Sequence, residues 1–394
     1  MSKEYTCPSC KRKEMSIFYS VKNVPVHSCV LLSNEKDALN FPVGDVKLGF
    51  CKKCGFISNV IFNPSLIDYS SNYEDQQSFS PTFNAFANDL ANHLVNKYDL
   101  HDKDILEIGC GKGDFLALLC KLGNNRGVGI DPAFIDDRIE SVSPEKITFI
   151  KDYYSEKYVK LKADFICCRH TLEHISQTGN FIKIIRDSIG EKLNTIVFFE
   201  VPDATKVLRD VVFWDIYHEH CSYFSPGSLA RLFRLKNFEV LDLRRAYGDQ
   251  YLLMEAKPTS KESKKVHDLE EKTTETEKWV NYFSNNCQIK ISKWKKRIEQ
   301  YRTDGLKIVV WGSGSKCVSF LTTLDVRDSI GAVIDINPYR HNKFIPFIGK
   351  EIMPPEYIKE YQPDVTLVMN PIYTQEIGKM MENLGVSSMI TAVE

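Results

Sequence analysis

Several features are missing from this 394-residue sequence, and each absence excludes a class of protein. No run of about 18 apolar residues occurs, so no segment is expected to span a membrane. The formal net charge is −1. Nucleic-acid-binding modules usually carry a clear basic excess, so no nucleic-acid partner is expected. The first residues contain no apolar signal stretch, and the absence of secretory features favours a cytoplasmic location.

The twelve cysteines are scattered along a long chain, which favours reduced thiols over a disulfide framework. Four of them form two C-x-x-C knuckles, Cys7 with Cys10 and Cys51 with Cys54. Two knuckles complete a tetrahedral thiolate shell for Zn²⁺, and four thiolates leave no open position, so the zinc would be structural. Two independent reduced pairs are the alternative. Cys29 and His27 are interpreted as bystanders, and the 40 residues between the knuckles predict an inserted small sheet.

Strand-like apolar runs alternate with amphipathic helices through much of the chain, which predicts a mostly parallel sheet with helices on both faces. The expected strands are 104–108, 127–131, 147–150, 164–168, 195–199 and 251–255. A charged stretch without proline or glycine follows, with apolar residues at helical spacing, and a second α/β pattern comes after it. We therefore expect a zinc-binding domain at 1–75, an α/β domain at 76–258, one or two connecting helices at 259–303 and a second Rossmann-like domain at 304–394.

A glycine-rich turn follows the first strand of the α/β domain. Gly109, Gly111 and Gly113 let the backbone approach a ligand closely, and Asp131, after the next strand, can accept hydrogen bonds from both ribose hydroxyls of a nucleoside. Glu107 precedes the turn by two residues. A carboxylate there repels a pyrophosphate but suits the cationic methionine end of S-adenosylmethionine. The pattern predicts a binding site for that cofactor, and therefore a methyltransferase; a tight turn without a ligand is the alternative.

Three further polar residues are candidates for the same crevice, because ligands of open α/β sheets bind beyond the carboxyl ends of the strands. Asp152 is placed to meet the adenine amino group, although an Asp in a loop is usually only solvated. His170 and Glu173 follow the fourth strand and are candidates to line the site. A helix-capping or packing role is equally compatible with their positions.

The segment Tyr217-His218-Glu219-His220 carries the candidate acid–base chemistry. A methyl group on a sulfonium is already activated, so the enzyme must supply a nucleophile aligned with it. A His has the pKa range for proton abstraction near neutrality, and a neighbouring Glu or Tyr can orient it or stabilise an oxyanion. An isolated His-rich tetrapeptide is more often a polar loop, but this one follows the fifth expected strand, on the ligand side of the sheet.

Over nearly its whole length the chain resembles the S-adenosylmethionine-dependent C-methyltransferases of deoxysugar biosynthesis, which act on nucleotide-linked keto sugars. The matching segments are the cysteine knuckles, 69–73, 106–111, 129–132, 169–174, 217–220, 311–314, 335–338 and 363–364. The resemblance implies a class I methyltransferase domain flanked by a zinc-binding domain and a second Rossmann-like domain. It also implies that His220 removes the proton α to the ketone, with Tyr217 and Glu219 assisting.

Two departures from the family pattern bear on the substrate. Residues 247–250 read Tyr-Gly-Asp-Gln where the family often has a Gly-Gly pair, and the turn at 312–317 lacks the third glycine of a dinucleotide site. The resemblance implies that this C-terminal lobe helps to hold the nucleotide-sugar without a second cofactor. The leading hypothesis is methylation at C3, α to a 4-keto group, through a His220-generated enolate. Alternatives are O- or N-methylation of a sugar or small metabolite, and a non-enzymatic zinc module.

Overall fold

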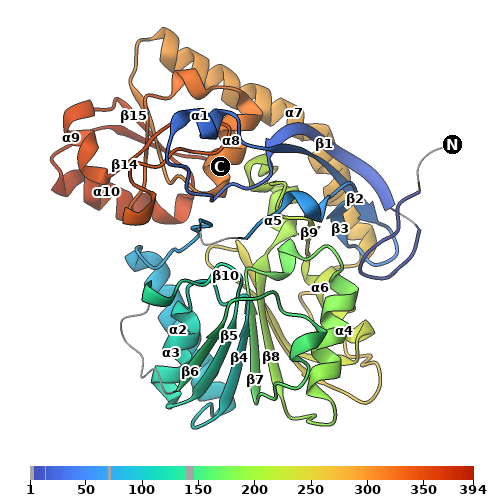
Figure 1. The fold of residues 1–394 in the computed structure, drawn as a ribbon. Coiled ribbons are helices and arrows are strands. Elements are labelled where there is room, and N and C mark those ends of the chain that lie inside the picture. Colours follow the sequence, from blue (N-terminus) through green and yellow to red (C-terminus); the bar gives the residue numbers. More distant parts are fainter. Residues whose placement is uncertain (1–3, 14, 70–71, 139–145) are drawn as a thin grey trace.

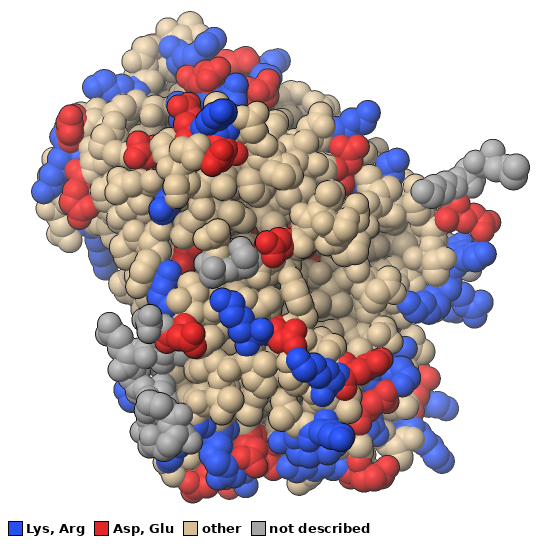
Figure 2. Space-filling model, viewed as in Figure 1, with Lys and Arg blue, Asp and Glu red and all other residues tan. Residues whose placement is uncertain are grey.

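The computed structural model describes residues 4–13, 15–69, 72–138 and 146–394. Three sheets organise these residues, with seven, five and four strands. No helix in this part of the chain is both long and apolar enough to cross a bilayer. Basic and acidic side chains are interspersed over the face in Figure 2, in keeping with the near-zero net charge.

The seven-stranded sheet forms the lower part of the molecule in Figure 1. Its strands, in spatial order, are β10 (Phe238–Ala246), β11 (Tyr251–Pro258), β8 (Ile196–Pro202), β7 (Phe165–Arg169), β4 (Asp104–Ile108), β5 (Arg126–Ile130) and β6 (Ile147–Ile150). The five strands from β8 to β6 are parallel, whereas β11 and β10 are antiparallel to their neighbours. Chain order reverses between β4 and β7, and such a switch point opens a crevice at the carboxyl ends of the strands. The expected Rossmann-like fold is confirmed.

Helices cover both faces of this sheet, with α2 and α3 on one side and α4 and α6 on the other (Figure 1). The helices of this part are α2 (Pro81–Tyr98), α3 (Asp114–Gly123), α4 (Thr178–Ile189), α5 (Ala204–Arg209) and α6 (Pro226–Leu235). Side chains cap the starts of α2 and α6: Ser80 accepts a hydrogen bond from the Phe83 N–H, and Ser225 forms a capping box with Ser228.

The N-terminal sheet is antiparallel and contains one strand from far along the chain. Its members are β1 (Met15–Pro25), β2 (Val43–Cys51), β3 (Ile57–Asn59) and β9 (Ser222–Tyr223), and the short helix α1 (Glu35–Leu39) lies between β1 and β2. The small sheet expected between the knuckles is thus present. Strand β9 pairs with β3, which attaches the segment after His220 to the N-terminal part of the chain.

A long helix leads into the C-terminal sheet. The elements are α7 (Thr273–Thr303), β12 (Ile308–Trp311), α8 (Ser315–Leu324), β13 (Ala332–Ile334), β14 (Ile352–Met353), α9 (Ile358–Tyr361), β15 (Val365–Val368), α10 (Thr374–Asn383) and β16 (Met389–Ala392). The five strands are parallel, in the order β14-β13-β12-β15-β16. One hydrophobic core joins side chains of β1, β2, α5, α7, α8 and this sheet, so the N- and C-terminal parts pack against each other.

Candidate active site

A cavity of about 560 Å³ opens at the carboxyl ends of β4, β5 and β7, at the switch point of the sheet. The glycine-rich turn forms part of its wall. Gly109 and Gly111 have φ angles of 70° and 56°, in the left-handed region that favours glycine. A Cβ at Gly109 would lie 1.9 Å from Thr171 Oγ1, so this position requires glycine for space as well. Gly113 lies at the N-cap of α3, where it starts the helix beside the cavity.

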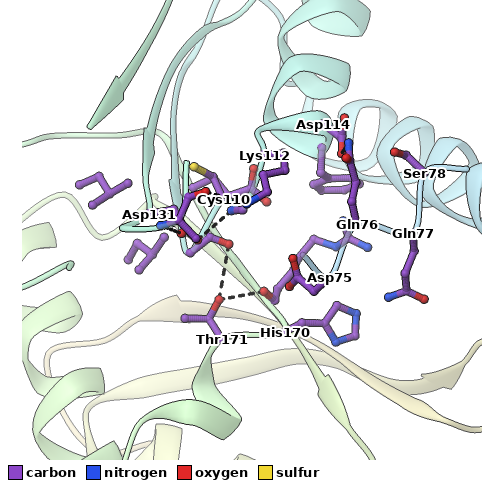
Figure 3. Close-up of a pocket in the computed structure, with 18 of the residues that line it drawn as sticks. Asp75, Gln76, Gln77, Ser78, Cys110, Lys112, Asp114, Asp131, His170 and Thr171 are labelled. Atoms are coloured by element: carbon purple, nitrogen blue, oxygen red, sulfur yellow. Dashed lines mark hydrogen bonds between the residues drawn. The ribbon is translucent and has the colours of Figure 1, made fainter. Parts of the chain in front are cut away.

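Asp131 joins the end of β5 to the glycine-rich turn. Its Oδ2 accepts a hydrogen bond from the Gly111 N–H at 2.8 Å, and its Oδ1 accepts one from the Ala133 N–H at 2.7 Å. A carboxylate has about four acceptor positions, so two remain for the hydroxyls of a bound ribose. In Figure 3, Asp131 and Cys110 lie on one side of the cavity and Gln76, Gln77 and Ser78 on the other.

Glu107 lies in the floor of the cavity and is only 2% exposed. Burial raises the pKa of this carboxyl to about 8. Its Oε2 has no hydrogen-bond partner in the described part of the chain. A buried acceptor without a partner is costly, and a cationic ligand group would compensate it. The residue set, a carboxylate for a cationic end and Asp131 for a ribose, therefore fits S-adenosylmethionine.

Asp152 also lines this cavity, but its oxygens already have partners. Lys157 Nζ lies 2.7 Å from Oδ2, the Tyr158 hydroxyl donates to the same oxygen at 2.5 Å, and the Tyr153 N–H donates to Oδ1. The hydrogen bond from Lys157 is the main reason that the pKa of Asp152 falls to about 2. An adenine amino group at Asp152 would therefore share the carboxylate with Lys157 and Tyr158, which already bind it.

A second cavity, of about 310 Å³, lies between the seven-stranded sheet and the C-terminal sheet. Residues of both lobes line it, including Tyr217 and His220 from one and Lys316 from the other. The two cavities share part of their walls. The shared residues are Tyr73, Asp75, Gln76, Gln77, His170 and His174. A cofactor in the first cavity and an acceptor in the second would meet at this wall.

His220 lies in the second cavity, close to the shared wall. Its ring packs edge-on against His174 and Tyr217, with centroids 4.7 and 4.6 Å apart. Burial lowers the pKa of His220 to about 4, so the imidazole is neutral at pH 7 and can accept a proton. The Tyr217 hydroxyl donates to Asp215, whose other oxygen lies 2.7 Å from Lys316 Nζ.

The other two residues of the motif face the N-terminal part of the chain. His218 packs against Gly44 in β2, where a Cβ would lie 2.5 Å from its Nε2. The Glu219 carboxylate lies 2.9 Å from His27 Nδ1 and accepts a hydrogen bond from the Ser28 N–H. The sequence interpretation of His27 as a bystander missed this contact, because no local pattern links residues 192 positions apart.

His170 is located on the wall that the two cavities share, with a left-handed φ of 47°. Its Nε2 lies 3.0 Å from Glu200 Oε1, and its Nδ1 lies 3.7 Å from Glu173 Oε1. Burial lowers the pKa of the imidazole, but these carboxylates outweigh burial and raise it to about 9. His170 is therefore cationic at neutral pH, unlike His220.

The four knuckle cysteines converge on one point. The Sγ atoms of Cys7 and Cys54 lie 3.7 Å apart, as do those of Cys10 and Cys51, and all four lie within 4.8 Å of one another. Four sulfurs at the Zn–S distance of about 2.3 Å, in tetrahedral geometry, lie about 3.8 Å apart. The cluster fits a single Zn²⁺ ion.

Comparison with known proteins gives matches along most of the chain. Residues 83–243 match the model of a family described as a methyltransferase domain, and residues 250–389 match the C-methyltransferase C-terminal domain. C-methyltransferase NovU of Streptomyces niveus is 23% identical over 372 residues, covering 88% of this chain and 85% of the relative.

Two solved structures match less than half of this chain. The 1,6-didemethyltoxoflavin-N1-methyltransferase of Burkholderia thailandensis is 18% identical and covers 44% of this chain and 79% of its own, with a TM-score of 0.33. Magnesium protoporphyrin IX methyltransferase of Synechocystis PCC 6803 is 14% identical and covers 45% and 84%, with a TM-score of 0.35. The cavity geometry and the two family matches lead to one conclusion: the chain is an S-adenosylmethionine-dependent methyltransferase with a class I Rossmann-like catalytic domain and the C-terminal domain of the C-methyltransferases.

Proposed function

We propose that this enzyme methylates a carbon α to a ketone, at C3 of a nucleotide-linked 4-keto-6-deoxy sugar. The observation that carries the proposal is the neutral imidazole of His220, which faces the second cavity beside the wall shared with the cofactor cavity. The match to the C-methyltransferase C-terminal domain and the likeness to NovU support carbon as the acceptor.

In this proposal the first cavity binds the cofactor and the second cavity binds the acceptor. S-adenosylmethionine supplies an activated methyl group when bound. Glu107 and Asp131 hold its cationic and ribose ends, and His220 removes the proton from the acceptor carbon. Tyr217, fixed by Asp215, orients the His220 ring. His170, cationic on the shared wall, is placed to stabilise the negative charge that develops on the ketone oxygen.

We also propose that Cys7, Cys10, Cys51 and Cys54 hold one structural Zn²⁺ ion within a zinc-binding domain at residues 1–75. A shell of four thiolates leaves no position for substrate, so the metal would stabilise the N-terminal part and take no part in methyl transfer. Contacts between the knuckles and the catalytic domain support a docking role. The Arg231 side chain donates to the Cys54 carbonyl, and the Gly179 N–H donates to the Pro8 carbonyl.

The test follows the carbon-bound proton. Purified enzyme is incubated in D₂O with S-adenosylmethionine and a panel of nucleotide-linked keto sugars, and mass spectrometry records a 14 Da gain and deuterium at the α carbon. His220→Asn should lower turnover by about 10²–10⁴, the usual contribution of a general base. The exposed His101→Asn serves as the control and should turn over like the wild type. An active enzyme that leaves the α hydrogen fully in place would refute C-methylation and support O- or N-methylation instead.

A further inference from the structure

The Glu219 carboxylate lies between the candidate base and the N-terminal part of the chain. It is 1% exposed, and His27, its closest partner, is 3% exposed. Its Oε2 is 2.9 Å from His27 Nδ1 and 3.0 Å from the Ser28 backbone nitrogen. Its Oε1 is 3.4 Å from the Ser315 hydroxyl of the C-terminal lobe. Three separate parts of the molecule therefore meet at this one carboxylate.

The hydrogen-bond directions at His27 can be assigned from its second partner. The Asp68 backbone N–H lies 2.9 Å from His27 Nε2 and can only donate. Nε2 must therefore carry a lone pair, which leaves the proton on Nδ1, where it is donated to Glu219. His27 is thus an uncharged donor, and Glu219 remains the anion of the pair. Burial opposes ionisation of Glu219, but the hydrogen bond from His27 and the smaller electrostatic contributions of the surrounding histidines together outweigh burial and lower the pKa of this carboxyl.

The chain around His220 is fixed on both sides by N-terminal residues. On one side, the Glu219 carboxylate is held by His27 and Ser28. On the other, the Asn59 N–H donates to the Cys221 carbonyl at 3.0 Å, where β3 and β9 begin to pair. His220 is the single residue between these two anchors. Its ring position in the second cavity therefore depends on both of them.

We propose that His27 is a positioning residue for methyl transfer: by donating Nδ1–H to Glu219, it fixes the backbone that aims the His220 imidazole at the acceptor. This inference rests on the proposed role of His220 as the base. It assigns a catalytic task to the N-terminal part of the chain in addition to the proposed metal site. It also gives Glu219 a role distinct from direct contact with substrate.

Two substitutions at His27 separate positioning from stability. In His27→Asn, the amide nitrogen replaces Nδ1 and keeps the donor to Glu219, but the acceptor for the Asp68 N–H is lost. In His27→Gln, the amide reaches the position of Nε2 and keeps that acceptor, but the donor to Glu219 is lost. Each variant loses one of two hydrogen bonds, so both should fold with similar loss of stability. Wild type, both variants and His220→Asn are compared in steady-state methyl transfer.

We expect His27→Asn to keep kcat within about threefold of the wild type. His27→Gln should lower kcat by about 10- to 100-fold with little change in KM, since small misplacement of a catalytic group has costs of this size. The acid limb of the kcat profile should also move to higher pH in His27→Gln, because Glu219 without its donor ionises at higher pH. The other titratable groups that face this carboxylate are Cys29, Tyr69, Tyr73, His174, His218 and His220.

Equal kcat values and acid limbs in the two His27 variants would show that His27 is only structural and would overturn the inference. If His220→Asn kept wild-type turnover, the proposed base itself would fail, which is a different result. ¹⁵N NMR of histidine-labelled, ligand-free protein gives a readout independent of activity. We expect His27 to show a protonated Nδ1 and an unprotonated Nε2. A protonated Nε2 would refute the assigned hydrogen-bond directions.

Discussion

Asp131 has two tasks, one in stability and one in cofactor binding, and substitution with asparagine tests both. Each of its oxygens accepts a backbone N–H, at 2.8 Å from Gly111 and 2.7 Å from Ala133. In Asp131→Asn one oxygen becomes an NH₂ group, which cannot accept, so one backbone donor loses its partner. Hydrogen bonds to charged groups contribute about 1.5–3 kcal/mol each. For a domain of this size, the loss corresponds to a decrease in Tm of roughly 3–12 °C.

The same substitution removes the charge that a bound ribose would meet. One charge-assisted hydrogen bond to the cofactor, at about 1.5–3 kcal/mol, corresponds to a Kd increase of roughly 10- to 150-fold. Isothermal titration calorimetry with S-adenosylmethionine measures this change, and differential scanning calorimetry measures the stability.

The C-terminal lobe offers a matched control. Asp335 accepts the Ser313 N–H at 2.8 Å and the Asn337 N–H at 2.9 Å, which repeats the geometry of Asp131. Asp335→Asn should lower Tm to a similar degree and leave the Kd for S-adenosylmethionine unchanged. Weakened cofactor binding in Asp335→Asn, with wild-type affinity in Asp131→Asn, would refute the assignment of the cofactor to the seven-stranded sheet.

Three further predictions concern the cofactor pocket and the knuckles. Burial raises the pKa of Glu107 to about 8, and a cationic ligand needs the carboxylate form, so the affinity for the cofactor should fall about tenfold per pH unit below pH 8. Titration calorimetry measures this pH dependence, and Glu107→Gln should remove it. An affinity of the wild type that does not change with pH would contradict the prediction. Atomic emission should find about one equivalent of zinc in the protein. Cys51→Ser should lose both the zinc and stability, whereas the remote Cys287→Ser should keep the zinc. A metal-free protein of full stability would show that the knuckles are incidental. Gly179→Ala should lower the free energy of unfolding in urea by about 1–3 kcal/mol, because its Cβ would lie 2.9 Å from the carbonyl oxygens of Pro8 and Ser9 in the first knuckle. At Gly378 the nearest atom to an added Cβ is 3.6 Å away, so Gly378→Ala should leave the stability unchanged or raise it.

The parts of the fold that follow from local patterns could be predicted from the sequence. The parallel strands are short buried apolar runs, and the glycine-rich turn is a contiguous motif, so a sequence pattern is sufficient to identify both, with their order along the chain. The connecting segment was less well defined. Helix α7 begins at Thr273, because the residues from 259 to 272 lack the apolar spacing that begins near Trp279.

The contacts around Glu219 could not be predicted, for a physical reason. The motif indicated acid–base residues, but which of them faces the substrate depends on partners brought together only by the tertiary fold. His27 and Ser315 reach Glu219 from opposite ends of the sequence. The partners of Asp152 are local in sequence, because Lys157 and Tyr158 follow it within six residues. The sequence alone still does not show that the loop turns both side chains back toward the Asp152 carboxylate.

The pairing of β3 with β9 also has a consequence for how the protein is made. About 165 residues of chain separate Ser58 from its partner Ser222. At 5–20 residues per second, a ribosome needs roughly 8–30 s to synthesise that interval. During this time the nascent N-terminal sheet has an open edge at β3, the kind of edge at which chains associate wrongly. The closing strand begins at Ser222, just after His220, so the N-terminal sheet is completed only when the segment carrying the candidate base has emerged.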